Sequence, residues 1–510
     1  MHKLKGMVKL HPIMTFMVLI IVTIILSGVL SLFGVEATYS TINTATKSYN
    51  QNLVTVESLL NLSGLKYIFS STVSNFAAFT PLNMLIIILI GIGVMEKSGF
   101  LKTITTIITQ KLQKRTVTLI ISLVCILSSL SGDLGYVILI PLSALIFFYG
   151  RRNPLLGITT AFASLTCGTG LSLFITSIDS SLIKTTLESA NILDSNYTIN
   201  TYGFILIMLV AIIIIAVIIT SITERLMVDK IARYEFKEEK KEFKLGKKEI
   251  KGLIFAFLAG ILYLLIFIYN IIPGLPLGGN LLDNTQTLYI DKLFSSNSFF
   301  SQGFVFIITM LFVILGLFYG IGAKTIKNNN DLCEDLGHSL DDIGQIIVMI
   351  FMASVFINVF KKTNIGVVTT ALLTNLITAS GFKGVALIIL MFVCVALATL
   401  FLPTTTSKWA IISGATIPVL MNAGISPEMG QLIFRFAEGA TYGLTPVMAY
   451  FVIYLAYMEK YNQSSEPLPM FKLLKYQLPY GAITAVVLLI ILITWYVIGL
   501  PLGISSIPTI

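Results

Sequence analysis

Apolar residues along this chain gather into runs of about 20, the length that a helix needs to cross the roughly 30 Å core of a bilayer. The uninterrupted runs lie at residues 12–33, 81–95, 201–223, 253–272, 304–320, 343–360 and 480–499. Three further apolar regions are broken by polar residues, at 117–149, 154–180 and 384–457. The pattern predicts a polytopic membrane protein, and other features must decide the three broken regions.

The charges that flank region 117–149 favour a re-entrant hairpin. Basic residues both precede and follow it, at positions 111, 114, 115, 151 and 152. Because basic loops mark the cytoplasmic side, both ends are expected on that side. The polar stretch Ser128–Gly135 then forms the tip, and each arm of about 14 residues is roughly 21 Å long, too short to span. A single span kinked at this stretch is the alternative.

Two stretches 273 positions apart share glycines, prolines and aromatic residues. The matched pairs are Tyr136 and Trp409, Pro154 and Pro427, Gly157 and Gly430, and Gly170 and Gly443. A second series, offset by 265, pairs 97–109 with 362–374 and predicts an amphipathic surface helix before each hairpin. On this match, 385–422 is a second hairpin with its tip at Pro403–Lys408. Such a pattern indicates an inverted repeat and places the binding site of a secondary transporter.

The predicted fold is all-α, with about nine transmembrane helices plus two re-entrant hairpins in an inverted repeat. Residues 1–80 form the first span and an outside loop. Residues 81–223 form the first repeat, with its hairpin near 117–149 and a broken helix at 154–180. Residues 224–342 form a cytoplasmic linker and two extra helices. Residues 343–510 form the second repeat, with its hairpin near 385–422 and a broken helix at 429–457.

Charge predicts how the chain enters the membrane. Segment 224–251 holds ten Lys or Arg against seven acidic residues, so it is expected in the cytoplasm. The N-terminus then lies inside and the C-terminus outside. The first apolar run is long and lacks a small-residue cleavage site, so it is predicted to be an uncleaved span.

Composition excludes several function classes. Of 510 residues, 55% are hydrophobic and 12% charged, with mean hydropathy +0.90, unlike a soluble chain of this length. The net charge of +9 forms no basic face with interleaved aromatics, so nucleic-acid binding is not expected. The cysteines are scattered singly and the histidines form no cluster, which predicts neither a disulfide framework nor a zinc site.

Glycines interrupt the two broken helices at Gly168–Gly170 and Gly439–Gly443. Unwound backbone inside a membrane is tolerated where it lines a cavity or binds something. Half-helix N-termini facing such a break favour anions, and half-helix C-termini favour cations. The alternative is that the glycines only allow close helix packing.

Ionisable residues in or near these elements are Asp133, Asp179, Lys408, Arg435 and Glu438. Each costs on the order of 2.5–3.5 kcal/mol at a span centre, so each needs a partner or a function. Arg435 and Glu438 are three apart on one helix and are expected to pair, which can be purely structural. Lys408 beside Trp409 can hold a carboxylate and an aromatic ring together, or can be an interfacial anchor. Asp179 can equally be a solvated residue at the outer mouth.

Hydroxyls crowd the same breaks and offer the hard oxygen ligands that Na⁺ takes, although they equally cap short half-helices. The predicted sodium ligands are Thr166, Thr169, Ser407 and Thr441. No nucleophile–base constellation stands out, so no enzyme and no cofactor beyond a coupling ion, H⁺ or Na⁺, is predicted. An ion channel and an intramembrane hydrolase using Asp133 and Asp179 stay as less favoured alternatives.

Several segments in chain order carry a family resemblance: Gly132–Leu142, Asn153–Ile158, Ile178-Asp179, Ser407–Ala410 and Arg435–Pro446. Together they resemble the aminobenzoyl-glutamate transporter (AbgT) family over nearly the whole chain. The resemblance implies a homodimer in the bacterial inner membrane, driven by an ion gradient. It implies uptake of aminobenzoyl-glutamate, or export of para-aminobenzoate and sulfonamides. A sodium-coupled dicarboxylate or short-peptide transporter of the same superfamily is the alternative.

By the same resemblance, Trp409 and Asp179 match positions that the family uses, and Glu438 stands where the family usually has Asp. Thr399, Tyr442 and Ser172 replace three side-chain amides, and Ser180 replaces a proline. Fewer amide donors for a carboxylate or sulfonyl group predict an altered substrate specificity.

The sequence therefore predicts a transporter whose partners are a small-molecule substrate and the lipid bilayer. The predicted substrate contacts are Trp409, Lys408, Thr399, Ser172, Tyr442, Gly170 and Gly443. The predicted ion-coupling residues are Asp179, Glu438, Arg435 and Asp133.

Overall fold

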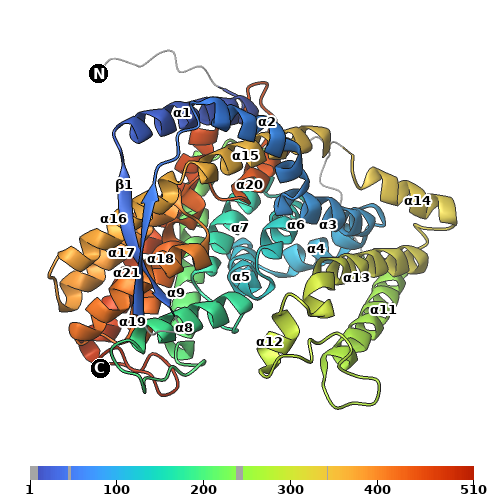
Figure 1. Cartoon of the computed structure of the whole chain (residues 1–510). Coiled ribbons are helices and arrows are strands. Elements are labelled where there is room, and N and C mark those ends of the chain that lie inside the picture. The colour runs from blue at the N-terminus through green and yellow to red at the C-terminus, as the bar shows by residue number, and fades with distance from the viewer. Residues whose placement is uncertain (1–9, 44–47, 237–244, 342) are drawn as a thin grey trace.

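A computed structural model describes residues 10–43, 48–236, 245–341 and 343–510 of the chain (Figure 1). Almost all of the regular structure in this part is helical, and its one sheet has two strands. Nine helical segments of the described residues are long and apolar enough to cross a membrane. The predicted all-α polytopic fold with about nine spans is confirmed.

Seven of these nine segments coincide with the uninterrupted apolar runs. They are α1 (Pro12–Leu32), α3 (Thr80–Lys97), which continues from α2 (Leu62–Ala77), α9 (Ile205–Ile222), α11 (Lys247–Ile271), α13 (Phe299–Ala323), α15 (Ile343–Lys362) and α21 (Met470–Ile498). The other two are α5 (Lys114–Leu127) with its 3₁₀ extension η1 (Ser128–Ser131), and α17 (Gly384–Phe401). The sequence assigned these two to hairpins and counted the broken helices as spans. The broken helices are each interrupted before they reach a spanning length.

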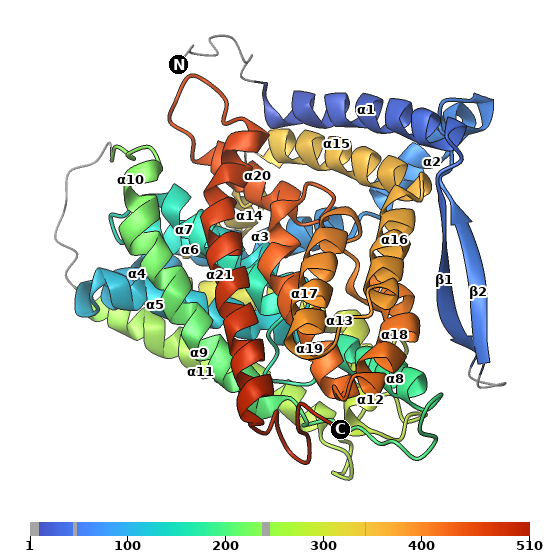
Figure 2. The ribbon, with the colours of Figure 1, turned by 90° about the vertical axis from the view of Figure 1, so that its left-hand side faces the viewer.

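The outside loop predicted after the first span contains ordered structure. Strands β1 (Glu36–Asn43) and β2 (Ser48–Thr55) pair antiparallel from Glu36↔Thr55 to Asn43↔Ser48. Figure 2 shows this ribbon along one side of the molecule, next to α16 (Ile365–Ala379) and α18 (Thr405–Asn422). The contact with α18 is close, because a Cβ on Gly414 would lie 2.5 Å from the Ser40 carbonyl oxygen. The ribbon is therefore packed on the second half of the chain.

Each predicted hairpin is a pair of helices joined by a short break. In the first, η1 and two further residues join α5 to α6 (Leu134–Tyr149), and both arms pack against α7 (Pro154–Thr169). In the second, Leu402–Thr404 joins α17 to α18, and both arms pack against α16 and α19 (Pro427–Thr441). The tip expected at Pro403–Lys408 is shorter than predicted. Lys408 consequently lies in the first turn of a helix.

Both broken helices begin alike and stop near their glycines. The Asn153 side chain caps α7 and the Ser426 side chain caps α19, each followed by a proline, whose fixed φ suits the first helical position. After Gly170 the chain restarts as α8 (Ser177–Ala190), which runs past the predicted end at residue 180. After α19, the short helix η3 (Tyr442–Leu444) leads to α20 (Phe451–Lys460).

The helices α3 to α9 recur in order as α15 to α21. The helix before each hairpin, α4 (Phe100–Lys111) or α16, starts at a residue with positive φ, Gly99 at 91° or Asn364 at 58°. These two caps are 265 positions apart, which matches the second sequence offset. Three features stay predictions: that the two halves enter the membrane in opposite orientations, that α4 and α16 lie on the membrane surface, and where the domain boundaries fall.

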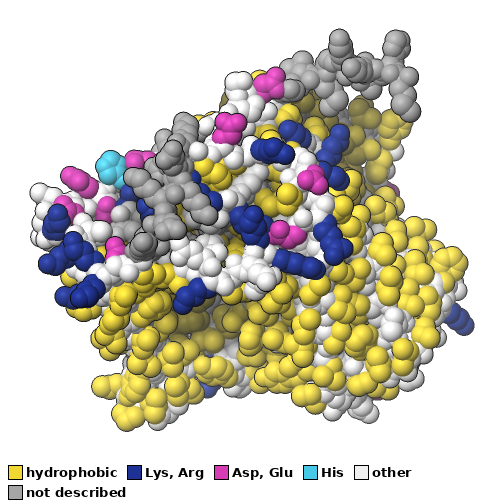
Figure 3. All heavy atoms as spheres, turned by 180° about the vertical axis from the view of Figure 1, so that it is seen from behind, with side chains coloured by type: hydrophobic (Ala, Val, Ile, Leu, Met, Phe, Trp, Pro, Cys, Tyr) yellow, Lys and Arg dark blue, Asp and Glu magenta, His cyan; other side chains and the backbone are white. Residues whose placement is uncertain are grey.

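The linker between the halves adds α11 and α13, which pack against each other, the short helix α12 (Tyr289–Phe294), and α14 (Asn329–His338). Charged side chains gather over one end of the molecule and leave a broad hydrophobic surface below (Figure 3). Four of the ten basic residues that predicted a cytoplasmic linker, Lys237, Lys240, Lys241 and Lys244, lie outside the described residues. Residues 1–9 also lie outside the described residues, and the inside position of the N-terminus stays a prediction.

Candidate functional site

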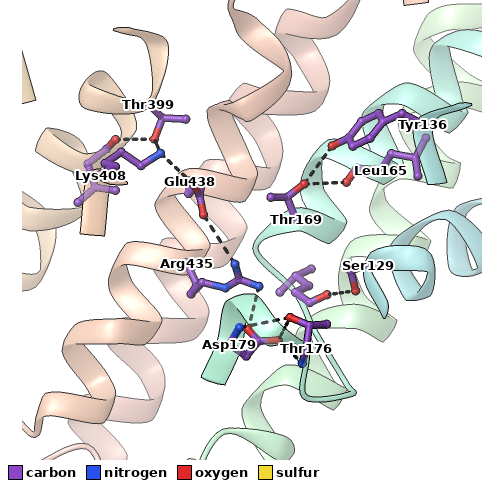
Figure 4. A network of polar contacts seen from close by, with 12 residues as sticks. Ser129, Tyr136, Leu165, Thr169, Thr176, Asp179, Thr399, Lys408, Arg435 and Glu438 are labelled. Carbon is purple, nitrogen blue, oxygen red and sulfur yellow. Dashed lines mark hydrogen bonds and ion pairs between the residues drawn. The ribbon is translucent and has the colours of Figure 1, made fainter. Parts of the chain in front are cut away.

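A line of charged side chains runs between the two halves of the protein (Figure 4). Lys408 Nζ on α18 lies 2.9 Å from Glu438 Oε1 on α19. Glu438 Oε2 lies 3.8 Å from Arg435 Nη1, one turn earlier on the same helix. Arg435 Nη2 lies 3.2 Å from Asp179 Oδ1 on α8. Four of the five predicted ionisable residues therefore form one buried network.

Lys408 stands at one end of this network. Its side chain is fully buried, and its ammonium also donates to Thr399 Oγ1 on α17 at 2.9 Å. The Thr399 hydroxyl in turn donates to the carbonyl of Val395. This environment differs from the interfacial anchor considered from sequence, because the ammonium faces a carboxylate inside the protein.

Asp179 stands at the other end and has two structural tasks. Its Oδ2 accepts hydrogen bonds from the backbone N–H and the hydroxyl of Thr176, which together cap the start of α8. Its Oδ1 faces Arg435, and 13% of the side chain is exposed. A carboxylate at a helix N-terminus is also stabilised by the helix dipole. Asp179 is thus a paired residue at the junction of α8 and α19.

Trp409 belongs to a neighbouring buried group that the sequence did not reveal. Its Nε1 donates to Thr186 Oγ1 on α8 at 3.0 Å, and Thr186 lies 2.7 Å from Gln431 Oε1 on α19. The indole also packs against Phe434. Trp409 therefore joins α18 directly to α8, two elements that the ion pairs connect only through α19.

A helical periodicity could have found part of this group. The polar residues of α19 recur every three or four positions, as Glu428, Gln431, Arg435 and Glu438, and all are buried. Residues so spaced share one helix face. Thr186 likewise follows Asp179 by two turns on α8.

The first half contributes a polar group beside the network. The Tyr136 hydroxyl lies 3.0 Å from Thr169 Oγ1, and Ser129 donates to the carbonyl of Leu171 (Figure 4). Asp133, directly before α6, is exposed, and among the described residues no ion pair joins it to the network. A cavity of about 40 Å³ is lined by Ser129, Asp133, Tyr136, Thr169, Ser172 and Arg435.

A second small cavity, of about 30 Å³, also borders Arg435. Ser172 and Arg435 line both cavities, and Asp179 lines this one. Because a water needs roughly 10–15 Å³ of such volume, each cavity holds a few waters at most. Both cavities are therefore too small for a metabolite in this conformation.

The glycines predicted as substrate contacts pack against other helices. A Cβ on Gly170 would lie 2.2 Å from the Arg435 carbonyl oxygen, and one on Gly443 would lie 2.9 Å from the Thr166 side chain. These positions fit the alternative considered from sequence, close approach of two helices. Tyr442, in η3, is half-buried. A role of these residues in substrate binding stays a prediction.

The hydroxyls predicted as sodium ligands have separate partners. Thr166 donates to Ala163, Thr169 to Leu165, and Thr441 to Ala396 and Ala437, all through backbone carbonyls. Ser407 is exposed in the first turn of α18. Among the described residues no group of three His, Cys, Asp or Glu could hold a metal ion. Sodium binding by these four residues stays a prediction.

Comparison with known proteins gives the family. The model of the AbgT putative transporter family matches residues 5–510. The p-aminobenzoyl-glutamate transport protein of Escherichia coli (strain K12) is 26% identical over 493 residues, which cover 97% of this chain and 93% of that protein.

Two solved structures are also similar. The YdaH transporter of Alcanivorax borkumensis has 26% identity and a TM-score of 0.48, over 97% of this chain and 100% of that chain. MtrF of Neisseria gonorrhoeae, described within a class of antimetabolite efflux pumps, has 28% identity and a TM-score of 0.49, over 98% of each chain. Because the family model matches nearly every residue, this chain belongs to the AbgT family, whose relatives are transport proteins and not enzymes.

Proposed function

We propose that this chain is an ion-coupled secondary transporter, which moves a small anionic aromatic metabolite across the bacterial inner membrane by alternating access. The substrate class is p-aminobenzoyl-glutamate, para-aminobenzoate or a sulfonamide. The relative from E. coli, a p-aminobenzoyl-glutamate transport protein, and that from N. gonorrhoeae, described within a class of antimetabolite efflux pumps, support this class. The protein works as a homodimer with its N-terminus in the cytoplasm, and the coupling ion is H⁺ or Na⁺.

The observation that carries the proposal is the buried line of charges between the halves. Asp179 comes from the first half, and Arg435 and Glu438 come from the second. Buried ion pairs are costly to assemble, by several kcal/mol of desolvation per ion, so they are weak evidence for stability alone. In a membrane protein such residues mark pathways for ions and substrates. Alternating access requires a contact of this kind, which can open and re-form.

Arg435 is the proposed anion site. It borders both cavities and already holds one carboxylate, that of Asp179. A guanidinium offers five donors in a fork that matches a carboxylate. A substrate carboxylate that binds Arg435 therefore competes with Asp179, and a proton or cation taken up at Asp179 helps the exchange.

Glu438 is the proposed coupling residue. Its Oε2 and the neighbouring Arg435 Nε are buried and have no hydrogen-bond partner among the described residues. Buried polar atoms are nearly always paired, so each exception needs an explanation, and here we propose that these two atoms gain a partner during the transport cycle. Protonation of Glu438 would weaken its hold on Arg435 and free the guanidinium for substrate.

Transport in reconstituted vesicles tests this proposal. Purified protein is assayed with p-aminobenzoyl-glutamate, para-aminobenzoate, a sulfonamide, succinate and a dipeptide, under an imposed H⁺ gradient, a Na⁺ gradient or neither. Gradient-driven flux of one of the first three supports the proposal. Substrate that moves in the same direction as the ion indicates symport, which supports import, and substrate that moves in the opposite direction indicates antiport, which supports export. Flux of succinate or the dipeptide alone favours the alternative substrate class, and flux that no imposed ion gradient changes favours a channel. Light scattering of the detergent-solubilised protein tests the dimer.

A further inference from the structure

The ammonium of Lys408, which lies on α18, is held by two oxygen atoms from two other helices, α17 and α19. Glu438 Oε1 and Thr399 Oγ1 each lie 2.9 Å from Nζ, and α17, α18 and α19 supply the three residues. The Thr399 hydroxyl uses its proton toward the Val395 carbonyl, so a lone pair faces the ammonium. The ring of Phe434 covers another side, with its centroid 5.5 Å from Nζ.

The two oxygens that contact Nζ, one from a hydroxyl and one from a carboxylate, are of the kind that an alkali cation also takes. Carboxylate, hydroxyl and carbonyl oxygens are the hard ligands of such ions. Here the positive charge comes from the protein itself. Lys408 is fully buried, and its ammonium forms an ion pair with the Glu438 carboxylate. A buried ammonium costs several kcal/mol of desolvation unless it is paired, so this position is specifically held by Glu438.

The charges around Lys408 balance without a further ion. Glu438 and Arg435 face it from α19, Asp179 follows through Arg435 from α8, and α17 presents Thr399, which is uncharged. The two cations Lys408 and Arg435 match the two anions Glu438 and Asp179. An additional Na⁺ beside Glu438 would leave one buried positive charge without a partner.

We propose that Lys408 is a built-in cation, which occupies at Glu438 and Thr399 the place that a mobile Na⁺ would take. The protein therefore needs no Na⁺ at this position, and removal of the Lys408 side chain creates a Na⁺ site there. The inference rests on the proposed function in one respect. If the protein is an ion-coupled transporter, H⁺ is left as the ion that Glu438 couples to transport.

Melting curves of purified protein in NaCl, KCl and choline chloride at equal ionic strength test this inference. The wild-type protein is expected to melt at the same temperature in all three salts. Lys408→Ala is expected to melt lower in choline and to be stabilised by Na⁺ in a saturable way, because a ligand that binds the folded state raises its stability. The double variant Lys408→Ala/Glu438→Gln is expected to lose the Na⁺ response.

Two matched variants separate a created site from a general salt effect. Lys408→Met fills the same space with an uncharged chain, so it is expected to show no Na⁺ response. Lys383→Ala removes an exposed lysine just before α17 and is expected to behave as wild type. If Lys408→Ala does not fold, Lys408→Ser, which leaves a similar space, is measured in its place.

A saturable Na⁺ response of the wild-type protein overturns the inference. A folded Lys408→Ala protein that does not distinguish Na⁺ from choline overturns it as well. These curves contain no substrate, so a failure to transport p-aminobenzoyl-glutamate would contradict the proposed function and leave this test unaffected.

Discussion

The two halves of the protein build the same helix contact from different chemistry. The middle of α19 meets α8 through Arg435 and Asp179, an ion pair. The residue 273 positions before Arg435 is Phe162 on α7, which meets α20 by stacking on Tyr454, with ring centroids 4.5 Å apart. The helices α7 and α20 are the counterparts of α19 and α8 in the other half. One contact is therefore charged and its counterpart is aromatic.

This difference indicates which of the two contacts can change when an ion binds or a proton is taken up. An aromatic stack does not change with protonation or with an added anion, whereas an ion pair does. Lys408 and Glu438 also stand only in the second half, since the first half has Gly135 and Leu165 at the matching positions. We expect the duplicated scaffold to move as two similar bodies, with coupling confined to the charged contact.

Glu438→Gln is expected to give the largest effect, a loss of gradient-driven transport in vesicles. The amide cannot be ionised, and it leaves the buried Lys408 ammonium without its counter-ion. Breaking a buried pair in this way costs about 3–5 kcal/mol, so a lower melting temperature is also expected.

Glu428→Gln is the matched control, because Glu428 lies on the same face of α19 and is also buried, but bonds to Tyr197 outside the network. It is expected to retain coupled flux. Full coupling in Glu438→Gln would show that the charges of the second half are structural.

Gly170→Ala tests the point at which the two broken helices meet. A Cβ there would lie 2.2 Å from the Arg435 carbonyl oxygen and 3.0 Å from the Gly439 Cα, so the backbones must separate. Overpacking of this kind costs about 1–3 kcal/mol, and the shift displaces Arg435. We expect a lower melting temperature and weaker substrate binding.

Gly344→Ala near the start of α15 is the control, since nothing lies within 4 Å of its Cβ position. It is expected to keep or raise the melting temperature, as alanine favours helix over glycine. Wild-type binding in Gly170→Ala would mean that the glycine is not required for the crossing.

Phe162→Leu is expected to lower stability while leaving coupling unchanged. The variant removes the stack on Tyr454, and such aromatic pairs are worth about 0.5–1.5 kcal/mol beyond their buried area. Melting temperature and the ratio of gradient-driven to passive flux are measured together. A fall in that ratio would show that the aromatic contact of the first half takes part in coupling.

Periodicity and spacing predicted the spans, the two hairpin regions and the two broken helices, because these depend on local hydrophobicity and on glycine and proline. Other features depend on contacts between distant residues. The β1–β2 ribbon was missed because its segment has few charges and no clear alternation. The pairing of Lys408 with Glu438 was missed because the two residues are 30 positions apart in the sequence. The expected Arg435–Glu438 pair is present at 3.8 Å, but the shorter contact of Arg435 is with Asp179, in the other half.

Tyr136→Phe is expected to give the smallest effect. The variant removes the hydroxyl that lies 3.0 Å from Thr169, and keeps the ring that stacks on Tyr450 with centroids 5.2 Å apart. A single neutral hydrogen bond contributes about 0.5–1.5 kcal/mol, and Thr169 retains its bond to the Leu165 carbonyl. We expect a slightly lower melting temperature, and a coupled flux within about twofold of the wild-type flux. Loss of coupling in this variant would mean that the hydroxyls of the first half carry protons, and the division between a charged half and an aromatic half would then have to be abandoned.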